Sequence, residues 1–153
     1  PLEVKKRNYE FYEPKTNHGS SLSACIHSII ASEIGKDDDA YYYFRQSVMM
    51  DLNDFKNNCS GGIHSACLGG TWMSVINGFA GMRDYPDGLH FSPRIPEKWN
   101  SYSFKIAWKG RIILVSVSQK ESVFKLISGE TCKIKILGKE YTLHKDNDLI
   151  VKI

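Results

Sequence analysis

Two short segments place glycine, serine and histidine directly before apolar residues at helical spacing. They are residues 17–21, Asn-His-Gly-Ser-Ser, and residues 60–64, Ser-Gly-Gly-Ile-His. Glycine lets the backbone approach a ligand closely, serine supplies hydroxyl and amide donors, and the start of a helix carries the positive end of its dipole. The two segments therefore predict anion-binding loops, with these candidate residues: Gly19, Ser20, Ser21 and His64.

Each segment taken alone also has a simpler explanation. Ser20 or Ser21 is a suitable N-cap, because a serine hydroxyl accepts a hydrogen bond from a free N–H of the first helical turn. A single histidine such as His64 is more often structural than functional. Cys59, His64 and Cys67 have side chains that can bind zinc, but no second matched pair stands nearby, so we expect no metal site. Two such junctions in neighbouring helical hairpins could converge on one anion such as phosphate, which supports the anion hypothesis and leaves both explanations open at this point.

The elements that must position these loops are predicted to be helical over residues 1–82. Apolar side chains recur at helical spacing over residues 21–35, and Gly35 stands where a C-terminal glycine is expected. A second helix is predicted over residues 37–52, since its three leading aspartates suit a helix N-terminus. A third is predicted over about residues 63–82, where small residues permit close packing. Short links between the helices predict antiparallel hairpins.

The apolar stripe of each helix is expected to be buried. These stripes include Leu22 and Ile26 on the first helix, Leu52 on the second and Trp72 on the third. The aromatic run over residues 41–44 is expected to serve helix packing, although an exposed tyrosine in it could stack on a sugar.

From Arg83 the sequence changes character. Four prolines and glycines, at 86, 88, 93 and 96, predict a connector over about residues 83–100. Beyond it, apolar and polar residues alternate in six short runs, at residues 101–108, 111–118, 122–127, 132–137, 140–143 and 149–153. Short strands with turn residues between them predict a small antiparallel β-sandwich. The expected fold is α+β, with helical residues 1–82 followed by a β domain at residues 83–153.

Charge and composition support two differently built parts. The chain has 153 residues, 42% of them hydrophobic, and a net charge of +3, which excludes a disordered or collagen-like protein. Residues 1–90 carry 8 Lys and Arg against 11 Asp and Glu, a net charge of −3, whereas residues 91–153 carry 12 against 6, a net charge of +6. The charge therefore changes sign close to the predicted domain boundary.

Several protein classes are excluded by what the sequence lacks. No apolar run reaches the roughly 18 residues of a membrane helix, and no secretion signal is visible. The four cysteines are too sparse for a disulfide framework, so we expect a reduced, cytoplasmic protein without a membrane partner. The basic strands lack the interleaved aromatic residues of a nucleic-acid surface, so no nucleic-acid partner is expected.

Four stretches of the chain carry a family resemblance. They are residues 12–31 (YEPKTNHGSSLSACIHSIIA), 41–54 (YYYFRQSVMMDLND), 61–82 (GGIHSACLGGTWMSVINGFAGM) and 87–111 (DGLHFSPRIPEKWNSYSFKIAWKGR). In this order they resemble the C-terminal portion of the disaccharide phosphorylases of glycoside hydrolase family 65, which act on maltose, trehalose or kojibiose. The resemblance implies that residues 1–82 are the last hairpins of an (α/α)6 barrel and that residues 83–153 are the C-terminal β-sandwich.

The resemblance also implies a reaction, the reversible phosphorolysis of an α-glucosyl disaccharide to β-glucose 1-phosphate and a free sugar. A carboxylic acid protonates the leaving oxygen while phosphate attacks C1 from the opposite face, whereas an inverting hydrolase needs a second carboxylate to activate water. By resemblance, Gly19, Ser20, Ser21 and His64 hold phosphate, and His18 orients the loop. Disaccharide and phosphate are the implied substrates, no cofactor is implied, and a homo-oligomer is expected.

A further implication is that this chain is part of an enzyme. The family's general-acid glutamate belongs to an earlier segment, expected upstream of residue 1, and none of the candidate glutamates (Glu3, Glu10, Glu13 and Glu33) stands in the corresponding motif. We therefore assign no catalytic residue here. The expected partner is the missing N-terminal part of the same polypeptide, and the 153-residue chain alone is expected to be inactive and to expose apolar barrel faces.

Two other functions stay open at this stage. A family-related α-glucoside hydrolase of the trehalase kind would need a base carboxylate at the anion loop, where residues 18–21 offer none. A non-catalytic carbohydrate-binding or subunit-contact module would need exposed aromatic residues in the β domain, for which Trp99, Tyr102 and Trp108 are the candidates. The alternative for these three rings, which we favour, is packing within the protein.

Overall fold

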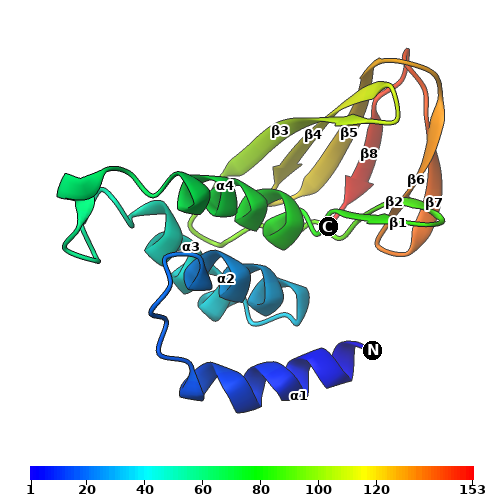
Figure 1. The fold of residues 1–153 in the computed structure, drawn as a ribbon. Coiled ribbons are helices and arrows are strands. Elements are labelled where there is room, and N and C mark those ends of the chain that lie inside the picture. The colour runs from blue at the N-terminus through cyan, green and yellow to red at the C-terminus, as the bar shows by residue number, and fades with distance from the viewer. The chain divides into compact units, whose positions relative to one another are not determined.

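The computed structural model describes all of residues 1–153 and divides into two compact units, Pro1–Gly78 and Phe79–Ile153. The first unit is helical and the second contains every strand (Figure 1). The division falls between residues 78 and 79, whereas the sequence predicts the boundary between residues 82 and 83. None of the helices combines the length and apolarity needed to cross a membrane.

The first unit holds four α-helices and three short segments of other helical types, the last of which ends one residue beyond it, at Phe79. In chain order the elements are α1 (Leu2–Tyr12), the 3-10 turn η1 (Glu13–Lys15), α2 (Ser23–Glu33), α3 (Asp37–Val48), the 3-10 turn η2 (Cys59–Gly61), α4 (Ser65–Met73) and the π-helical segment η3 (Ser74–Phe79). Helix α1 was not predicted individually, because Tyr9 is its one buried residue and it therefore has no apolar stripe.

Helices α2 and α3 form the predicted antiparallel hairpin. Gly35 adopts a positive φ of 80° just after α2, and the Lys36 N–H donates to the Ala31 carbonyl at 2.9 Å, which is the C-terminal glycine motif expected there. Across the pair, the buried Ser28 hydroxyl donates to the Ala40 carbonyl at 2.8 Å. The three aspartates occupy the first turn of α3, as predicted.

The start of α2 differs from the prediction. The helix begins at Ser23 with Leu22 in the N-cap position, and no side chain caps it. Ser20 instead accepts a hydrogen bond from the Leu22 N–H at 3.2 Å, within a turn that precedes the helix. The N-cap prediction for Ser20 or Ser21 was therefore wrong, because the serine oxygen closes a local turn.

The single helix predicted over residues 63–82 is shorter and changes type. Helix α4 begins at Ser65, and the backbone becomes π-helical from Ser74. The close packing expected from small residues is present at Gly70, where an added Cβ would lie 2.4 Å from the Cys25 sulfur of α2. The buried Ser74 hydroxyl contacts the carbonyl oxygens of Gly70 and Cys25 at 3.1 and 3.3 Å, which fastens α4 to α2.

Part of the predicted apolar stripes is not buried. Leu52 is 77% exposed, because α3 ends at Val48 and leaves it in the following turn. Ile26 and Trp72 are about half exposed, whereas Cys25, Ile29 and Cys67 on the same helices are buried. The helical unit therefore carries apolar faces that its own elements do not cover.

The second unit is a two-sheet sandwich with the strands β1 (Arg83–Tyr85), β2 (Gly88–Phe91), β3 (Ser101–Trp108), β4 (Arg111–Ser118), β5 (Glu121–Ser128), β6 (Cys132–Ile136), β7 (Lys139–Leu143) and β8 (Leu149–Lys152). One sheet has the order β1-β2-β6-β7 and the other β3-β4-β5-β8 (Figure 1). Buried side chains of both sheets form one core, in which the rings of Phe91 and Phe124 lie 5.0 Å apart. All six predicted strands are present.

Two features of the sandwich correct the prediction. Strands β1 and β2 lie inside the segment predicted to be a connector, and Pro86 and Gly88 belong to the turn and strand start of this hairpin, with φ 125° at Gly88. The sandwich is also not wholly antiparallel, because β2 pairs in parallel with β6, with Leu89 opposite Ile134.

Candidate functional site

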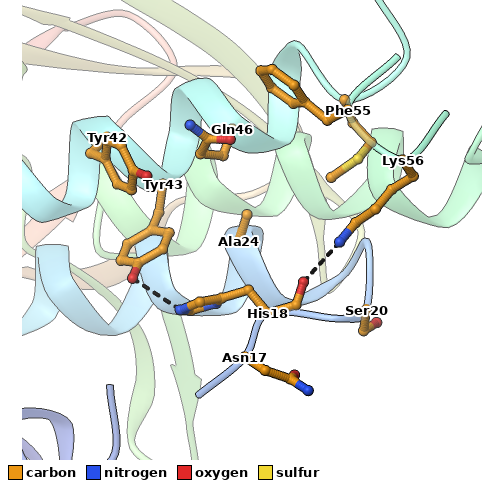
Figure 2. A pocket seen from close by; sticks show the side chains of 10 residues that line it. Asn17, His18, Ser20, Ala24, Tyr42, Tyr43, Gln46, Phe55 and Lys56 are labelled. Atoms are coloured by element: carbon orange, nitrogen blue, oxygen red, sulfur yellow. Dashed lines mark hydrogen bonds between the residues drawn. The ribbon is translucent and has the colours of Figure 1, made fainter. Parts of the chain in front are cut away.

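A cavity of about 350 Å³ lies beside the first predicted anion loop (Figure 2). Its walls come from that loop, from helices α2 and α3, and from the segment that follows α3. The lining residues are Asn17, His18, Ser20, Ala24, Tyr42, Tyr43, Gln46, Met50, Phe55 and Lys56. No Asp or Glu belongs to this set, and Lys56 is its one permanently charged member, so the cavity suits an anion.

His18 is held in place by three contacts. Its φ is 50°, in the left-handed region that residues other than glycine seldom adopt. On the ring, Nδ1 lies 2.9 Å from the Ser23 hydroxyl oxygen and Nε2 lies 3.1 Å from the Tyr43 hydroxyl oxygen. The His18 carbonyl accepts a hydrogen bond from Lys56 Nζ at 2.9 Å. Such contacts fit the loop-orienting role predicted for His18, which stays a prediction.

Tyr43 joins the loop to helix α3 and to the turn after α1. The Tyr43 side chain is buried, and its hydroxyl donates to a Glu13 carboxylate oxygen. The hydroxyl has one proton, which it donates to Glu13, so its oxygen accepts a hydrogen bond from His18. The donating atom is Nε2, which therefore carries the proton of the imidazole. Burial, followed by the neighbouring His27, lowers the pKa of His18 and so favours the neutral ring.

The loop leaves some of its donors free. The Gly19 N–H donates to the Asn17 side-chain oxygen at 3.0 Å, and the Ser20 oxygen accepts from the Leu22 N–H. The backbone N–H groups of Ser20 and Ser21 and the Ser21 hydroxyl make no hydrogen bond within the protein. Three donors at one turn are therefore available to a bound anion.

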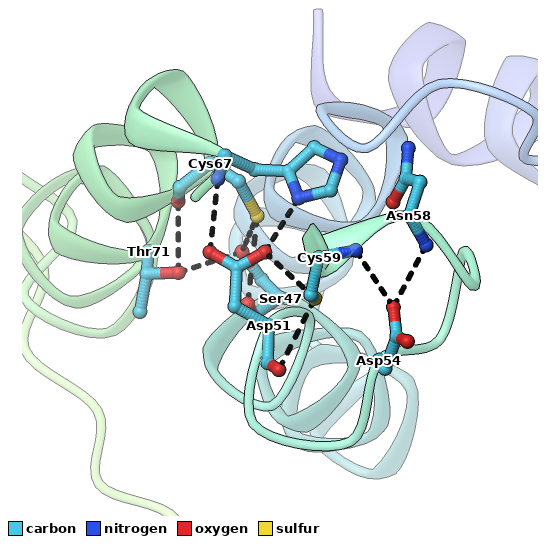
Figure 3. A network of polar contacts seen from close by, with 8 residues as sticks. Ser47, Asp51, Asp54, Asn58, Cys59, Cys67 and Thr71 are labelled. Carbon is cyan, nitrogen blue, oxygen red and sulfur yellow. Dashed lines mark hydrogen bonds and ion pairs between the residues drawn. The ribbon is translucent and has the colours of Figure 1, made fainter. Parts of the chain in front are cut away.

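The second predicted loop is organised by two aspartates (Figure 3). Asp51 accepts the His64 backbone N–H at 3.0 Å, and its other oxygen lies 2.5 Å from His64 Nδ1. Asp54 accepts the backbone N–H groups of Asn58 and Cys59 at 2.9 and 3.0 Å. The hydrogen bond from His64 lowers the pKa of Asp51. The His64 ring is thus oriented by a carboxylate, which leaves Nε2 as its other polar atom.

The predicted residues do not all line one cavity. Ser20 and His18 line the cavity described above, and Gly19 and Ser21 are the chain neighbours of Ser20. His64 is not among the lining residues and belongs to the Asp51 network. The convergence of the two loops on one phosphate therefore stays a prediction.

Several residues of this site were missed from the sequence. No sequence pattern indicated a role for Lys56, Asp51 or Asp54, and Tyr43 was expected to serve mainly helix packing. Asp51 and Asp54 could have been noticed, since aspartates in polar loops commonly accept nearby backbone N–H groups. Lys56 carried no local signal, because its contact with His18 spans 38 residues.

The other candidate sites have structural explanations. The chain gathers no group of three or more His, Cys, Asp or Glu side chains in an arrangement that could hold a metal ion, and all four cysteines are free thiols. Tyr102 and Trp108 pack against the sandwich core, and the Trp99 ring lies 5.1 Å from that of Phe79. The Tyr102 hydroxyl donates to the Arg94 carbonyl at 2.9 Å. These rings are therefore packing residues rather than an open sugar platform.

Comparison with protein-family models accounts for most of the chain. The model described as "Glycosyl hydrolase family 65 central catalytic domain" matches residues 2–73. The model described as "Glycosyl hydrolase family 65, C-terminal domain" matches residues 82–143. The two matches fall in the helical unit and in the sandwich, respectively.

Individual relatives belong to the same group of enzymes and match both parts of the chain. The chain is 49% identical to an alpha,alpha-trehalose phosphorylase from Thermoanaerobacter brockii over an alignment of 140 residues. This alignment covers 92% of this chain and 18% of the relative. The chain is 37% identical to a maltose phosphorylase from Bacillus subtilis (88% of this chain, 18% of the relative) and 40% identical to a kojibiose phosphorylase from Halothermothrix orenii (98% and 18%). The chain thus spans about a fifth of the length of these proteins.

A solved structure matches the whole chain. The putative kojibiose phosphorylase from human microbiome superimposes with a TM-score of 0.94 at 36% sequence identity, covering 100% of this chain and 22% of that one. The helices and the sandwich therefore occur together in a larger protein of similar sequence.

Proposed function

This chain belongs to glycosyl hydrolase family 65, and from that premise we propose that it is part of an inverting disaccharide phosphorylase. Its relatives are phosphorylases of trehalose, maltose and kojibiose. The proposed reaction cleaves an α-glucosyl disaccharide with inorganic phosphate, and gives β-glucose 1-phosphate and a free sugar. This chain contributes the phosphate-binding loops, and the general acid comes from another part of the complete enzyme.

The observation that carries the proposal is the chemistry of the cavity beside Ser20. Its lining offers hydroxyl, amide and ammonium donors and contains no carboxylate. A hydrolase of inverting mechanism would require a carboxylate base to activate water. Phosphate is already an anionic nucleophile, so it needs no base to activate it. Hydrogen-bond donors and a positive charge are enough to bind it. The cavity therefore favours phosphorolysis over hydrolysis.

In the proposed step, a phosphate oxygen forms a bond to C1 of the glucosyl group as the bond from C1 to the leaving oxygen breaks. The electron pair of the breaking bond stays on the leaving oxygen, which takes a proton from the general acid. Attack from the opposite face converts the α-linkage into the β-phosphate. The free N–H groups of Ser20 and Ser21, the Ser21 hydroxyl and the His64 ring would hold the phosphate in line with that bond.

The uncovered apolar faces of the helical unit support a larger helical domain. Leu22, Ile26 and Trp72 are all 40% or more exposed although they lie in apolar helical stripes. We propose that the unit forms the last hairpins of an (α/α)6 barrel, whose other helices would cover these side chains. The active enzyme would then need the rest of the polypeptide, and the 153-residue chain alone would be inactive.

The test uses the complete enzyme with trehalose, maltose and kojibiose, each with and without phosphate. We expect sugar phosphate to form only when phosphate is present, and proton NMR to show the β-anomer first. Sodium sulfate at equal ionic strength serves as the control and should support no turnover. Release of glucose at a comparable rate without phosphate would identify a hydrolase and contradict the proposal.

A further inference from the structure

Lys56 is the cation of the cavity beside the anion loop. Its Nζ donates to the His18 carbonyl at 2.9 Å, so the ammonium contacts the anion loop at His18 (Figure 2). The segment after α3 supplies this lysine, 38 residues further along the chain than the loop that it contacts. Two of the three ammonium protons are left for another acceptor.

The charge of Lys56 is not neutralised by the protein. Lys5 and Lys36 of the same unit pair with Glu33 and Glu10, at 2.5 and 3.9 Å, respectively. No carboxylate lies within ion-pairing distance of Lys56, and none lines the cavity. Glu13, which accepts from Tyr43, lines a separate cavity between α1 and α2. Lys56 Nζ thus contacts the His18 carbonyl, two residues before the unpaired N–H of Ser20, in a cavity that all three residues line. An ammonium without a carboxylate partner in such a cavity favours an anion.

We propose that Lys56 is the cationic residue of the phosphate site, where its charge attracts phosphate and its hydrogen bond to His18 holds the loop. This inference rests on the proposed function and assigns a residue to the same site. The ligand class is a phosphate dianion, free or as the phosphate group of glucose 1-phosphate in the reverse reaction. A neutral disaccharide has no charge for Lys56 to recognise.

The charge and the hydrogen bond can be separated by substitution. In Lys56→Gln the side chain keeps an N–H donor for the His18 carbonyl and loses the charge, whereas Lys56→Arg keeps both. Loss of a charge-assisted contact should raise the KM for phosphate roughly 10- to 100-fold in Lys56→Gln. The KM for the disaccharide should change by less than about twofold, and Lys56→Arg should stay within about threefold of the wild type for both substrates.

Lys15 provides a matched control. Its Nζ also donates to a backbone carbonyl at 2.9 Å, that of Phe11, but it does not line the cavity. Lys15→Gln should therefore leave the KM for phosphate unchanged. Measurements use the complete enzyme in both reaction directions at constant ionic strength, with thermal unfolding to compare the folded state of each variant.

Three results would overturn the assignment. A phosphate KM for Lys56→Gln within twofold of the wild type would show that the charge does not act on phosphate. An equal rise in both KM values would show a structural role alone, and so would equal effects of Lys15→Gln and Lys56→Gln. If Lys56→Gln does not fold, Lys56→Met, which also removes the charge, takes its place. With a native melting temperature, a phosphate KM raised tenfold or more supports the assignment, and one within twofold of the wild type overturns it. A wild-type enzyme that turns over without phosphate would instead refute the proposed function.

Discussion

Asp51 holds His64 at two points, through the backbone N–H at 3.0 Å and through ring Nδ1 at 2.5 Å. One carboxylate thus fixes both the position at which α4 begins and the orientation of the imidazole. Cys59 also contacts Asp51, since its thiol donates to the Asp51 carbonyl at 3.3 Å. The loop between α3 and α4 is therefore organised around this aspartate, and the proposed phosphate contact of His64 depends on it.

The Asp51→Asn variant should reveal this dependence through the pH profile of stability. The His64 hydrogen bond lowers the pKa of Asp51 below its ordinary value of 3.8, so the native state binds the proton less tightly than the unfolded chain does. The stabilisation is therefore complete above that ordinary value and disappears as the pH falls through the lowered pKa. In urea unfolding, the wild type should be the more stable at about pH 5 and converge with Asp51→Asn towards about pH 2. A difference that stays constant over this range would contradict the account.

The hydroxyl of Tyr43 should stabilise the helical unit. Tyr43→Phe removes the hydroxyl that joins Glu13 to His18, so each of these two residues loses one hydrogen bond. We expect a loss of about 1–2 kcal/mol in the free energy of unfolding, measured with urea on the 153-residue chain. Tyr42→Phe is the control, because Tyr42 is 57% exposed and its hydroxyl has no hydrogen bond in the protein. The control should stay within about 0.5 kcal/mol of the wild type. Equal effects of the two variants would argue against the link.

The packing of α4 on α2 can be tested with two neighbouring glycines. An alanine at Gly70 would place Cβ 2.4 Å from the Cys25 sulfur, whereas one at Gly69 would meet nothing within 4 Å. Gly70→Ala should cost about 1–3 kcal/mol, and Gly69→Ala should be neutral or stabilise by up to about 1 kcal/mol. Adding Cys25→Ala to Gly70→Ala should recover part of the loss in thermal unfolding. Two alanine variants of equal stability would mean that the helices are not packed as described.

The sequence predicted the sandwich better than it predicted the site. The six runs of alternating apolar residues correspond to strands β3–β8, because burial on one face of a strand leaves a local period of two. Strand β1 has only three residues, Arg83–Tyr85, and the turn after it contains a proline, so the same signal was too short to read. In the helical unit, the apolar stripes predicted α2 and α3, but they did not show which stripe residues lack a covering partner.

The missing parts of the site share one physical cause. Tyr43 and His18 are 25 residues apart, Asp51 and His64 are 13 apart, and no short motif records that they meet. Their contacts depend on how α3 packs on α2 and on how the chain after α3 folds back. The Gly-Ser-Ser and Gly-Ile-His junctions could be recognised from the sequence because their donors are local. The residues that orient those donors appeared only with the tertiary structure.

The measurement that tests the central claim most directly is the KM for phosphate in Ser21→Ala and His64→Ala variants of the complete enzyme. Each substitution removes a donor proposed to hold phosphate and none proposed to hold the sugar. We expect each variant to raise the KM for phosphate roughly tenfold or more while the KM for the disaccharide changes by less than about twofold. Equal changes in the two KM values, or no change in that for phosphate, would contradict the assignment of these loops as a phosphate site.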